Sequence, residues 1–308
     1  LTVIKNFWTY NRKASQIKYL GNTLVKTAPL LMCALSILFS YKVGLFNIGA
    51  AGQYCVGAAL SLYAALGLGW SWLPCMLAAI LGGALLAGIS GLLKSYCNVN
   101  EVISGIMLNW IVLYLTNMLL TLVKEHASPY TKVLANTNAS AVLPSLGLGA
   151  LFNKNQYVGL AIPLAVVMAV IVWIVLDKTK FGYELKATGL NKNAAKYCGM
   201  AEKRNIILSL MISGALAGLA GVTYYLGYLQ SIQPKVLAST GFDAIAVALL
   251  GNSNPVGIIF SSFLITGVTK GSSYMNSASG IETEIGSVIT GLILLFSACG
   301  AFVRYEVK

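Results

Sequence analysis

Long apolar stretches alternate with short polar connections along almost the whole chain. A helix of roughly 20 residues crosses a hydrocarbon layer of about 30 Å, and stretches close to this length cover 24–41, 43–69, 70–93, 102–123, 157–176, 205–229, 242–270 and 285–303. Helices satisfy their own backbone hydrogen bonds in lipid, so the pattern predicts an all-α, polytopic transmembrane bundle. Counting broken or re-entrant helices, we expect about 8–10 membrane segments in a single domain of residues 1–308.

Glycines and polar residues interrupt two of these stretches, at 44–53 and 251–257. In the second, Pro255 lacks a backbone donor and disfavours helix at the residue before it, which predicts a turn. Irregular backbone at membrane depth needs cover from protein or a water-filled cavity, and transporters use such breaks as solute sites. An ordinary loop between shorter helices stays an alternative at each break. The amides that we expect along a translocation path are Asn47, Gln53, Asn109, Asn252 and Asn254, with a buried interhelical hydrogen bond as the other interpretation of Asn109.

Composition supports a membrane protein. Hydrophobic residues make up 57% of the chain and charged residues 10%, whereas soluble domains average roughly a quarter charged residues. The net charge of +12 does not indicate nucleic acid, because the basic residues lie in short connections and at the ends of the apolar stretches.

The most highly charged connection is 177–204, which holds seven Lys or Arg residues and three acids. The excess of positive charge predicts that this loop is cytoplasmic. We then expect 94–101 and the C-terminus on the same side, and 124–156 and 271–283 outside. The same count places four basic residues near the chain start outside, which conflicts with the charge rule unless one early span is re-entrant or a segment before Leu1 is missing; we expect a missing N-terminal helix. These residues are Lys5, Arg12, Lys13 and Lys18.

The sequence offers little bond chemistry. It contains no Walker A pattern, so any ATP-driven work requires a separate ATPase chain. Glu101 and Asp243 stand near expected helix starts, where capping is the favoured role, and we find no ion-coupling carboxylate at the midplane. His126, the single histidine, is expected in solvent, and no metal, cofactor or catalytic residue is predicted. The six cysteines are scattered and are expected to be buried free thiols: Cys33, Cys55, Cys75, Cys97, Cys198 and Cys299.

Small residues over 213–221 include the pair Gly214 and Gly218, a spacing that lets neighbouring helices approach closely. Trp70 and Trp72 are typical of an anchor at the membrane interface. Both features predict a packed bundle and are silent about the solute.

Four separated segments resemble the permease subunits of bacterial ABC importers for nucleosides, in a superfamily that also includes permeases for ribose, other simple sugars and branched-chain amino acids. The resemblance extends from Thr23 to the C-terminus. It rests on residues 44–53, 100–109, 189–199 and 241–257. One departure is Ala51, which stands where the family usually has Glu.

This resemblance implies a type II ABC importer-like fold in a bacterial plasma membrane. The implied partners are a second permease subunit in a heterodimer, two cytosolic ABC ATPase subunits and an extracellular substrate-binding lipoprotein, in addition to membrane lipid. The loop 177–204 then corresponds to the segment that couples the permease to its ATPase, through Gly189, Asn191, Ala194, Ala195, Tyr197 and Gly199. Two rival classes stay open: an ion-coupled carrier with discontinuous helices and a membrane scaffold that transports nothing.

Overall fold

The structure is a computed structural model and describes residues 16–125, 128–234, 237–280 and 282–306. Within these ranges the regular structure is helical, and it contains no strand. The main helices are α2 (Gln16–Tyr41), α3 (Ala50–Leu66), α4 (Trp72–Cys97), α5 (Glu101–Thr121), α7 (Ala161–Lys178), α8 (Lys180–Leu190), α9 (Lys192–Tyr197), α10 (Glu202–Tyr224), α11 (Thr240–Leu250), α12 (Pro255–Ser279) and α13 (Glu284–Glu306).

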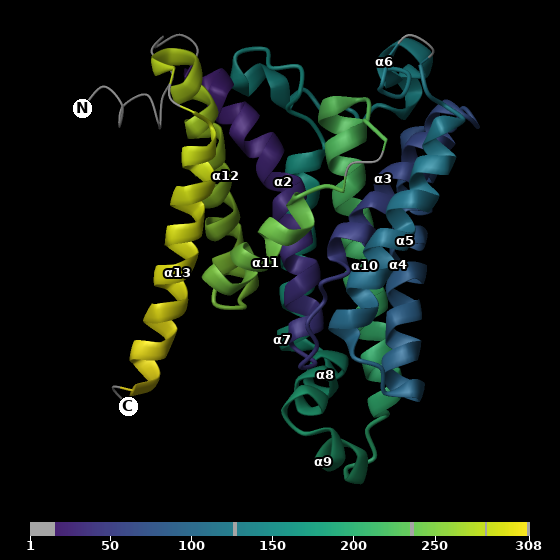
Figure 1. The fold of residues 1–308 in the computed structure, drawn as a ribbon, viewed down its shortest axis with the longest axis vertical. Coiled ribbons are helices and arrows are strands. Elements are labelled where there is room, and N and C mark those ends of the chain that lie inside the picture. Colours follow the sequence, from purple (N-terminus) through teal and green to yellow (C-terminus); the bar gives the residue numbers. More distant parts are fainter. Residues whose placement is uncertain (1–15, 126–127, 235–236, 281, 307–308) are drawn as a thin grey trace.

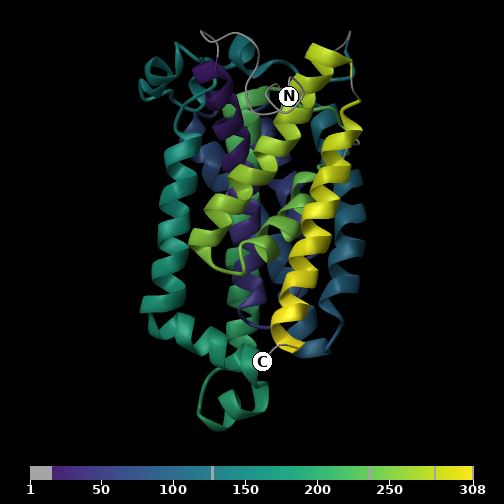
Figure 2. The same cartoon turned by 90° about the vertical axis from the view of Figure 1, so that its left-hand side faces the viewer.

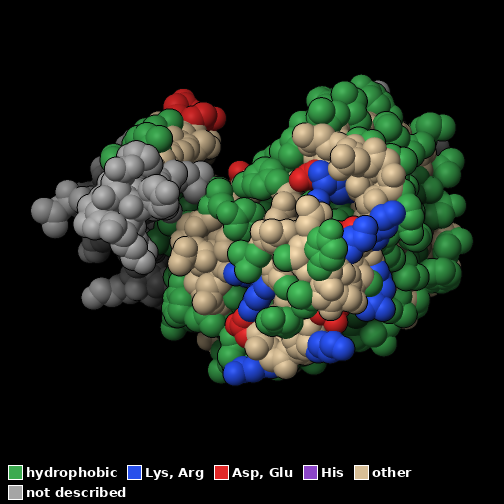
Figure 3. Space-filling model, turned by 90° about the horizontal axis from the view of Figure 1, so that it is seen from below, with side chains coloured by type: hydrophobic (Ala, Val, Ile, Leu, Met, Phe, Trp, Pro, Cys, Tyr) green, Lys and Arg blue, Asp and Glu red, His purple; other side chains and the backbone are tan. Residues whose placement is uncertain are grey.

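The long helices run side by side, and α8 and α9 project from one end of the bundle (Figures 1 and 2). The connection 98–100 between α4 and α5 lies at this same end, as the charge pattern predicts. The opposite end carries 122–160, with the short helix α6 (Leu134–Thr137), and the connection between α12 and α13. Seen from the α8–α9 end, Lys and Arg side chains are scattered over this face of the molecule (Figure 3). The charge rule predicts that this end is cytoplasmic, and the two ends are labelled cytoplasmic and outer on that basis.

Six described helices are long and apolar enough to cross a membrane, and α3, α11 and part of α13 are shorter apolar helices. The most enclosed spans are α2 and α10, with 83% and 72% of their apolar windows buried, which places them at the centre of the bundle. By contrast, α5 and α7 are each 28% buried and lie at its periphery.

The stretch 242–270 is not one crossing. It divides into α11 and α12, which reverse direction at a turn that lies short of the cytoplasmic ends of α4 and α13 (Figure 1). Asn252 and Ser253 adopt left-handed backbone angles in this turn, and the side chain of Asn254 accepts a 2.9 Å hydrogen bond from Val256 N to begin α12. The predicted break is therefore confirmed, and the hairpin returns the chain to the outer end.

Glycines bring α10 against α4. A Cβ added at Gly214 would lie within 3 Å of both Gly83 and Ala87, and one added at Gly218 would overlap Ala79. The close helix approach predicted from the Gly-x-x-x-Gly spacing is confirmed.

Two of the cysteine expectations were wrong. Cys33, Cys55 and Cys75 are buried, but Cys97 and Cys198 are exposed because they end α4 and α9 at the cytoplasmic surface. The side chain of Cys299, together with Lys5, Arg12, Lys13 and His126, lies outside the described residues.

The cap of α5 also differs from the expectation for Glu101. The side chain of Asn100 accepts the capping hydrogen bond from Val102 N, at 2.9 Å. Glu101 instead forms a 2.7 Å ion pair with Lys94 at the end of α4, while it remains in the first turn, where a carboxylate is favourable.

Candidate functional site

The cytoplasmic tip formed by α8 and α9 is anchored to the bundle at both of its ends. At the start of α8, the Thr179 hydroxyl donates to Val175 O at 2.6 Å and accepts from Gly182 N at 3.1 Å. Because these bonds join the end of α7 to the beginning of α8, they fix the direction in which the chain leaves the membrane. Leu185, which is fully buried, holds the middle of α8 against the bundle.

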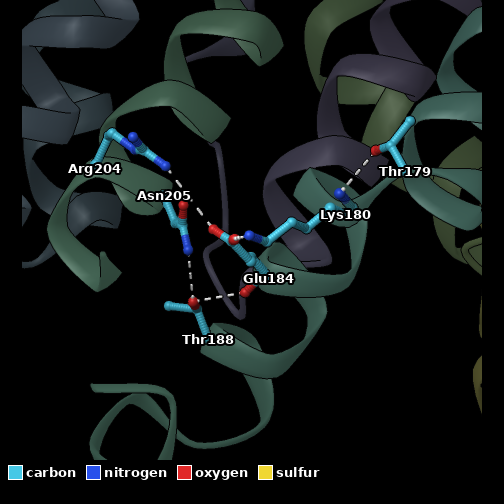
Figure 4. A network of polar contacts seen from close by, with 7 residues as sticks. Thr179, Lys180, Glu184, Thr188, Arg204 and Asn205 are labelled. Carbon is cyan, nitrogen blue, oxygen red and sulfur yellow. Dashed lines mark hydrogen bonds and ion pairs between the residues drawn. The ribbon is translucent and has the colours of Figure 1, made fainter. Parts of the chain in front are cut away.

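A polar network connects α8 to the start of α10 (Figure 4). Thr188 donates to Glu184 O at 2.7 Å and accepts from Asn205 Nδ2 at 3.2 Å. The Glu184 carboxylate lies 4.0 Å from both Lys180 and Arg204. The buried hydrogen bond from Asn205 to Thr188 connects the tip directly to a central helix of the bundle.

Helix α9 has only six residues, and both of its ends are capped. Asn191 has extended backbone angles, and its side chain accepts from Ala194 N at 3.1 Å. At the other end Gly199 has φ +77°. Gly199 N donates a hydrogen bond to Lys196 O, and Met200 N donates one to Ala195 O, each at 3.0 Å. This pair of bonds is a Schellman motif, in which glycine takes the left-handed position.

The six residues expected to couple to an ATPase therefore lie on one compact tip, but they face in different directions. Ala195 is buried against the rest of the tip, whereas Tyr197 is 92% exposed. Leu190, which the sequence reasoning did not select, is 88% exposed. A large apolar side chain with such exposure at the end of a polar tip is a contact candidate, and its position between α8 and α9 was the signal for it.

Gly189 belongs to a different contact. A Cβ there would lie 2.5 Å from Lys42 O and 2.9 Å from Val43 C, so α8 packs directly on the backbone that opens the first helix break. Beside this contact is a cavity of about 570 Å³ between α2, α5 and α8. Partial burial, and then the Lys186 ammonium, lower the pKa of Lys42 below its usual value, while Asp177 raises it in part.

Asn47 and Gln53 in the first break bond to each other. Asn47 Nδ2 donates to Gln53 Oε1 at 2.9 Å, and Gln53 Nε2 donates back to Asn47 Oδ1 at 3.1 Å. Asn47 also donates to Ser213 Oγ at 2.8 Å, and Ser213 in turn bonds Ser36. The network joins α2, α3 and α10 around the unwound segment. No pattern in the sequence pointed to the two serines.

Asn109 braces the same break from α5. Its Oδ1 accepts from Gly52 N at 2.9 Å, and its Nδ2 donates to Ile48 O at 3.1 Å. It therefore satisfies two backbone groups at the start of α3 that have no partner within the helix. Asn47, Gln53 and Asn109 are all buried, and their amides are engaged within the subunit.

Asn252 and Asn254 are not part of this network. They are exposed in the turn between α11 and α12. The first break instead contacts the first turn of α11, where a Cβ at Gly241 would lie within 3 Å of three atoms of Ala51. The start of α3 and the start of α11 therefore pack backbone to backbone, and the missing side chain of Gly241 permits this approach.

These features define a multi-pass membrane protein whose helices are interrupted within the span and whose cytoplasmic end carries a small, doubly capped helical tip. The profile of the family described as branched-chain amino acid transport system / permease component matches residues 19–298. The chain belongs to this family, whose members are transport subunits rather than enzymes.

Three relatives are nucleoside-type permeases. The chain is 34% identical to the guanosine ABC transporter permease NupP of Bacillus subtilis, with 96% of this chain and 85% of NupP covered. It is 35% identical to the nucleoside ABC transporter permease NupB of Lactococcus lactis, with 91% and 79% covered. It is 29% identical to a second guanosine permease of the same Bacillus strain, NupQ, with 86% and 85% covered.

The fold is also found in a solved structure, PsaBC from Streptococcus pneumoniae in complex with Fab. The TM-score is 0.54 at 15% sequence identity, with 96% of this chain and 94% of that chain covered. At this identity the similarity concerns the fold alone.

Proposed function

We propose that this chain is the membrane-spanning permease subunit of an ATP-driven importer in a bacterial plasma membrane and that its solutes are nucleosides. We choose nucleosides because the chain is 34–35% identical, over more than nine tenths of its length, to permeases named for guanosine and nucleosides. Ribose-like sugars are the second candidate, because a glucose ABC transporter permease is 29% identical.

The proposed partners are inferred from the missing Walker A pattern, from the α8–α9 tip and from the pairing of related permeases. It has no Walker A pattern, so a cytosolic ABC ATPase must supply the work, and the α8–α9 tip within 177–204 is where we place its docking. A second permease completes a heterodimer, since one Bacillus strain has both NupP and NupQ among the relatives. An extracellular binding lipoprotein delivers the solute to the outer end.

In this mechanism the ATPase contacts Leu190 and Tyr197, and closure of the ATPase pushes on α8. The push reaches the first helix break through Gly189 against Lys42 and reaches α10 through Thr188 and Asn205. Such a movement biases the bundle between outward-open and inward-open arrangements.

The five amides proposed for the translocation path form two groups, one exposed and one buried within the subunit. Asn252 and Asn254 are exposed in the α11–α12 turn and offer amide groups to a neutral solute. Asn47, Gln53 and Asn109 already bond within the subunit, so their contribution to the path is the shape of the broken segment, or solute contact after that network opens.

The decisive experiment is uptake into vesicles that contain the reconstituted transporter. We expect ATP-dependent uptake of a labelled nucleoside in the presence of the ATPase and the binding lipoprotein, with ribose as the comparison solute. Uptake that proceeds without ATP and follows an ion gradient would contradict the importer assignment. ATP-dependent uptake of ribose in preference to nucleosides would retain the importer and replace its solute.

Docking is tested with two substitutions of exposed side chains. Leu190→Asp and Tyr197→Ala should each weaken ATPase binding to the permease roughly 10-fold to 150-fold, because a buried side chain of this size contributes about 1.5–3 kcal/mol. Tyr183→Ala is the control, since Tyr183 is 66% exposed but lies in the first half of α8, on the membrane side of the tip. Normal ATPase binding by both tip variants would place the docking surface elsewhere.

A further inference from the structure

Two lysines lie inside membrane-spanning helices near the outer end. Lys26 is ten residues into α2, and Lys270 is nine residues before the end of α12. At 1.5 Å per residue, each is about 15 Å along its helix from the outer end. Lysines at such positions are rare in membrane helices and are functional candidates.

The two side chains converge on one ring. Lys26 Nζ is 5.7 Å and Lys270 Nζ is 5.9 Å from the ring centroid of Tyr228, at the end of the helix that continues α10. Lysines that merely extend to water would diverge, because like charges repel.

Carboxylates do not balance this charge. The ion pairs among the described residues involve Lys94, Lys180, Lys186 and Arg204, and neither Lys26 nor Lys270 has an acidic side chain within 4.0 Å. The neighbours of Tyr228 are the neutral rings of Tyr157 and Tyr224. The site is therefore a partly buried cationic pair that an anion would stabilise.

An apolar groove of about 210 Å³ lies between α7 and the two helices that carry the lysines, α2 and α12. Its surface is almost entirely hydrocarbon. It is open at the periphery, since Val166 is 43% and Phe260 is 71% exposed. The residues that line it are Leu24, Thr27, Ala28, Leu31, Ile162, Ala165, Val166, Ile259, Phe260 and Phe263.

The groove and the lysine pair are aligned along the membrane normal. Phe263 and Lys270 are seven residues apart on α12, so they share a face and are separated by about 10 Å along the helix. Because α12 ascends toward the outer end, Lys270 lies on the outer side of the groove and Phe263 lies deeper. Lys26 reaches the site from α2 by way of the Tyr228 ring, which the ammonium groups of both lysines approach.

We propose that Lys26, Lys270 and the groove below them bind an anionic phospholipid of the outer leaflet. The phosphate lies between the two ammonium groups, and one acyl chain descends along Phe263 and Leu31. Charge complementarity identifies the headgroup as anionic, and the depth and apolar lining of the groove identify a hydrocarbon chain. The lipid would join α2, at the centre of the bundle, to the peripheral helices α7 and α12.

The test is native mass spectrometry of the purified transporter complex, titrated with phosphatidylglycerol or with zwitterionic phosphatidylcholine. We expect phosphatidylglycerol to bind more tightly. Lys26→Gln and Lys270→Gln should each weaken it about fivefold, and the double variant about 30-fold, since a lysine near an anionic headgroup contributes about 1 kcal/mol. Lys178→Gln is the matched control, because Lys178 also lies over an aromatic ring, Trp173 at 5.6 Å, but at the cytoplasmic end.

A second pair of variants tests the groove without changing charge. Val166→Trp fills the groove and should reduce phosphatidylglycerol binding, whereas Val170→Trp, one turn further along α7 and 47% exposed, should not. Equal binding of the two lipids, or an equal loss in Lys178→Gln, would overturn the proposal. So would displacement of the lipid by millimolar inorganic phosphate, which would identify a free-anion site. Lysine variants that keep the lipid but lose the binding lipoprotein would identify a protein-docking surface instead.

Discussion

The capping of α9 offers the sharpest test of how the tip works. The perturbation is Asn191→Ala combined with Gly199→Ala. The first substitution removes the bond from Asn191 to Ala194 N, a loss of about 1 kcal/mol. The second forces a residue with a Cβ into φ +77°, which costs about 1–2 kcal/mol. No atom lies within 4 Å of the added Cβ at Gly199, so the second effect is conformational and not steric.

Together the two substitutions remove about 2 kcal/mol from a helix of six residues, which is too short to be stable by itself. This corresponds to a shift of about 30-fold between folded and unfolded α9. If the ATPase binds only folded α9, ATP-driven uptake should fall by up to the same factor. The thermal unfolding temperature of the bundle should stay unchanged, because α9 projects from it (Figure 2).

The assay combines uptake with hydrogen exchange of the α9 amides, which should become faster in the double variant. Gly147→Ala is the matched control. Gly147 has φ +71° and open space around the added Cβ, but it lies in the outer connection. The reasoning is refuted if α9 exchanges as in the wild type, or if it exchanges faster while uptake is unaffected.

Three further predictions concern other parts of the chain. Bound ATPase should protect the exposed thiol of Cys198 from a maleimide. Cys97 is tested in a separate variant in which it is the exposed cysteine that remains, and it should keep reacting when the ATPase is bound. Equal labelling of Cys198 with and without ATPase would count against docking at the tip. Gly214→Val should lower the free energy of unfolding by about 1–3 kcal/mol, because the added side chain overpacks the contact between α4 and α10, and should therefore lower the unfolding temperature. Gly291→Val, in open space, should leave the unfolding temperature nearly unchanged in the same thermal scan. Asn109→Leu should cost about 1–3 kcal/mol, measured by thermal unfolding, because two backbone groups at the start of α3 lose their partner; an unchanged unfolding temperature would show that water replaces the amide.

Local chemistry made much of the fold predictable from the sequence. The length of the apolar stretches determined the bundle, since a bilayer accepts few other structures. Pro255 and Asn254 end one helix and begin another through bonds to their own neighbours, and Asn191 and Gly199 cap α9 in the same way. The positive charge of 177–204 indicated its side of the membrane.

Contacts between distant residues required the tertiary structure. Asn47 looks like a path residue in the sequence, and only the packing of α10 shows that it bonds Ser213, 166 positions away. The turn at 251–257 was predictable, but the contact of the start of α11 with Ala51 through Gly241 was not. The sequence by itself determined the membrane bundle, the helix breaks and the form of the 177–204 tip, because each depends on residues a few positions apart. The tertiary structure decided which polar groups are engaged and which stay free, because that depends on which distant helices become neighbours.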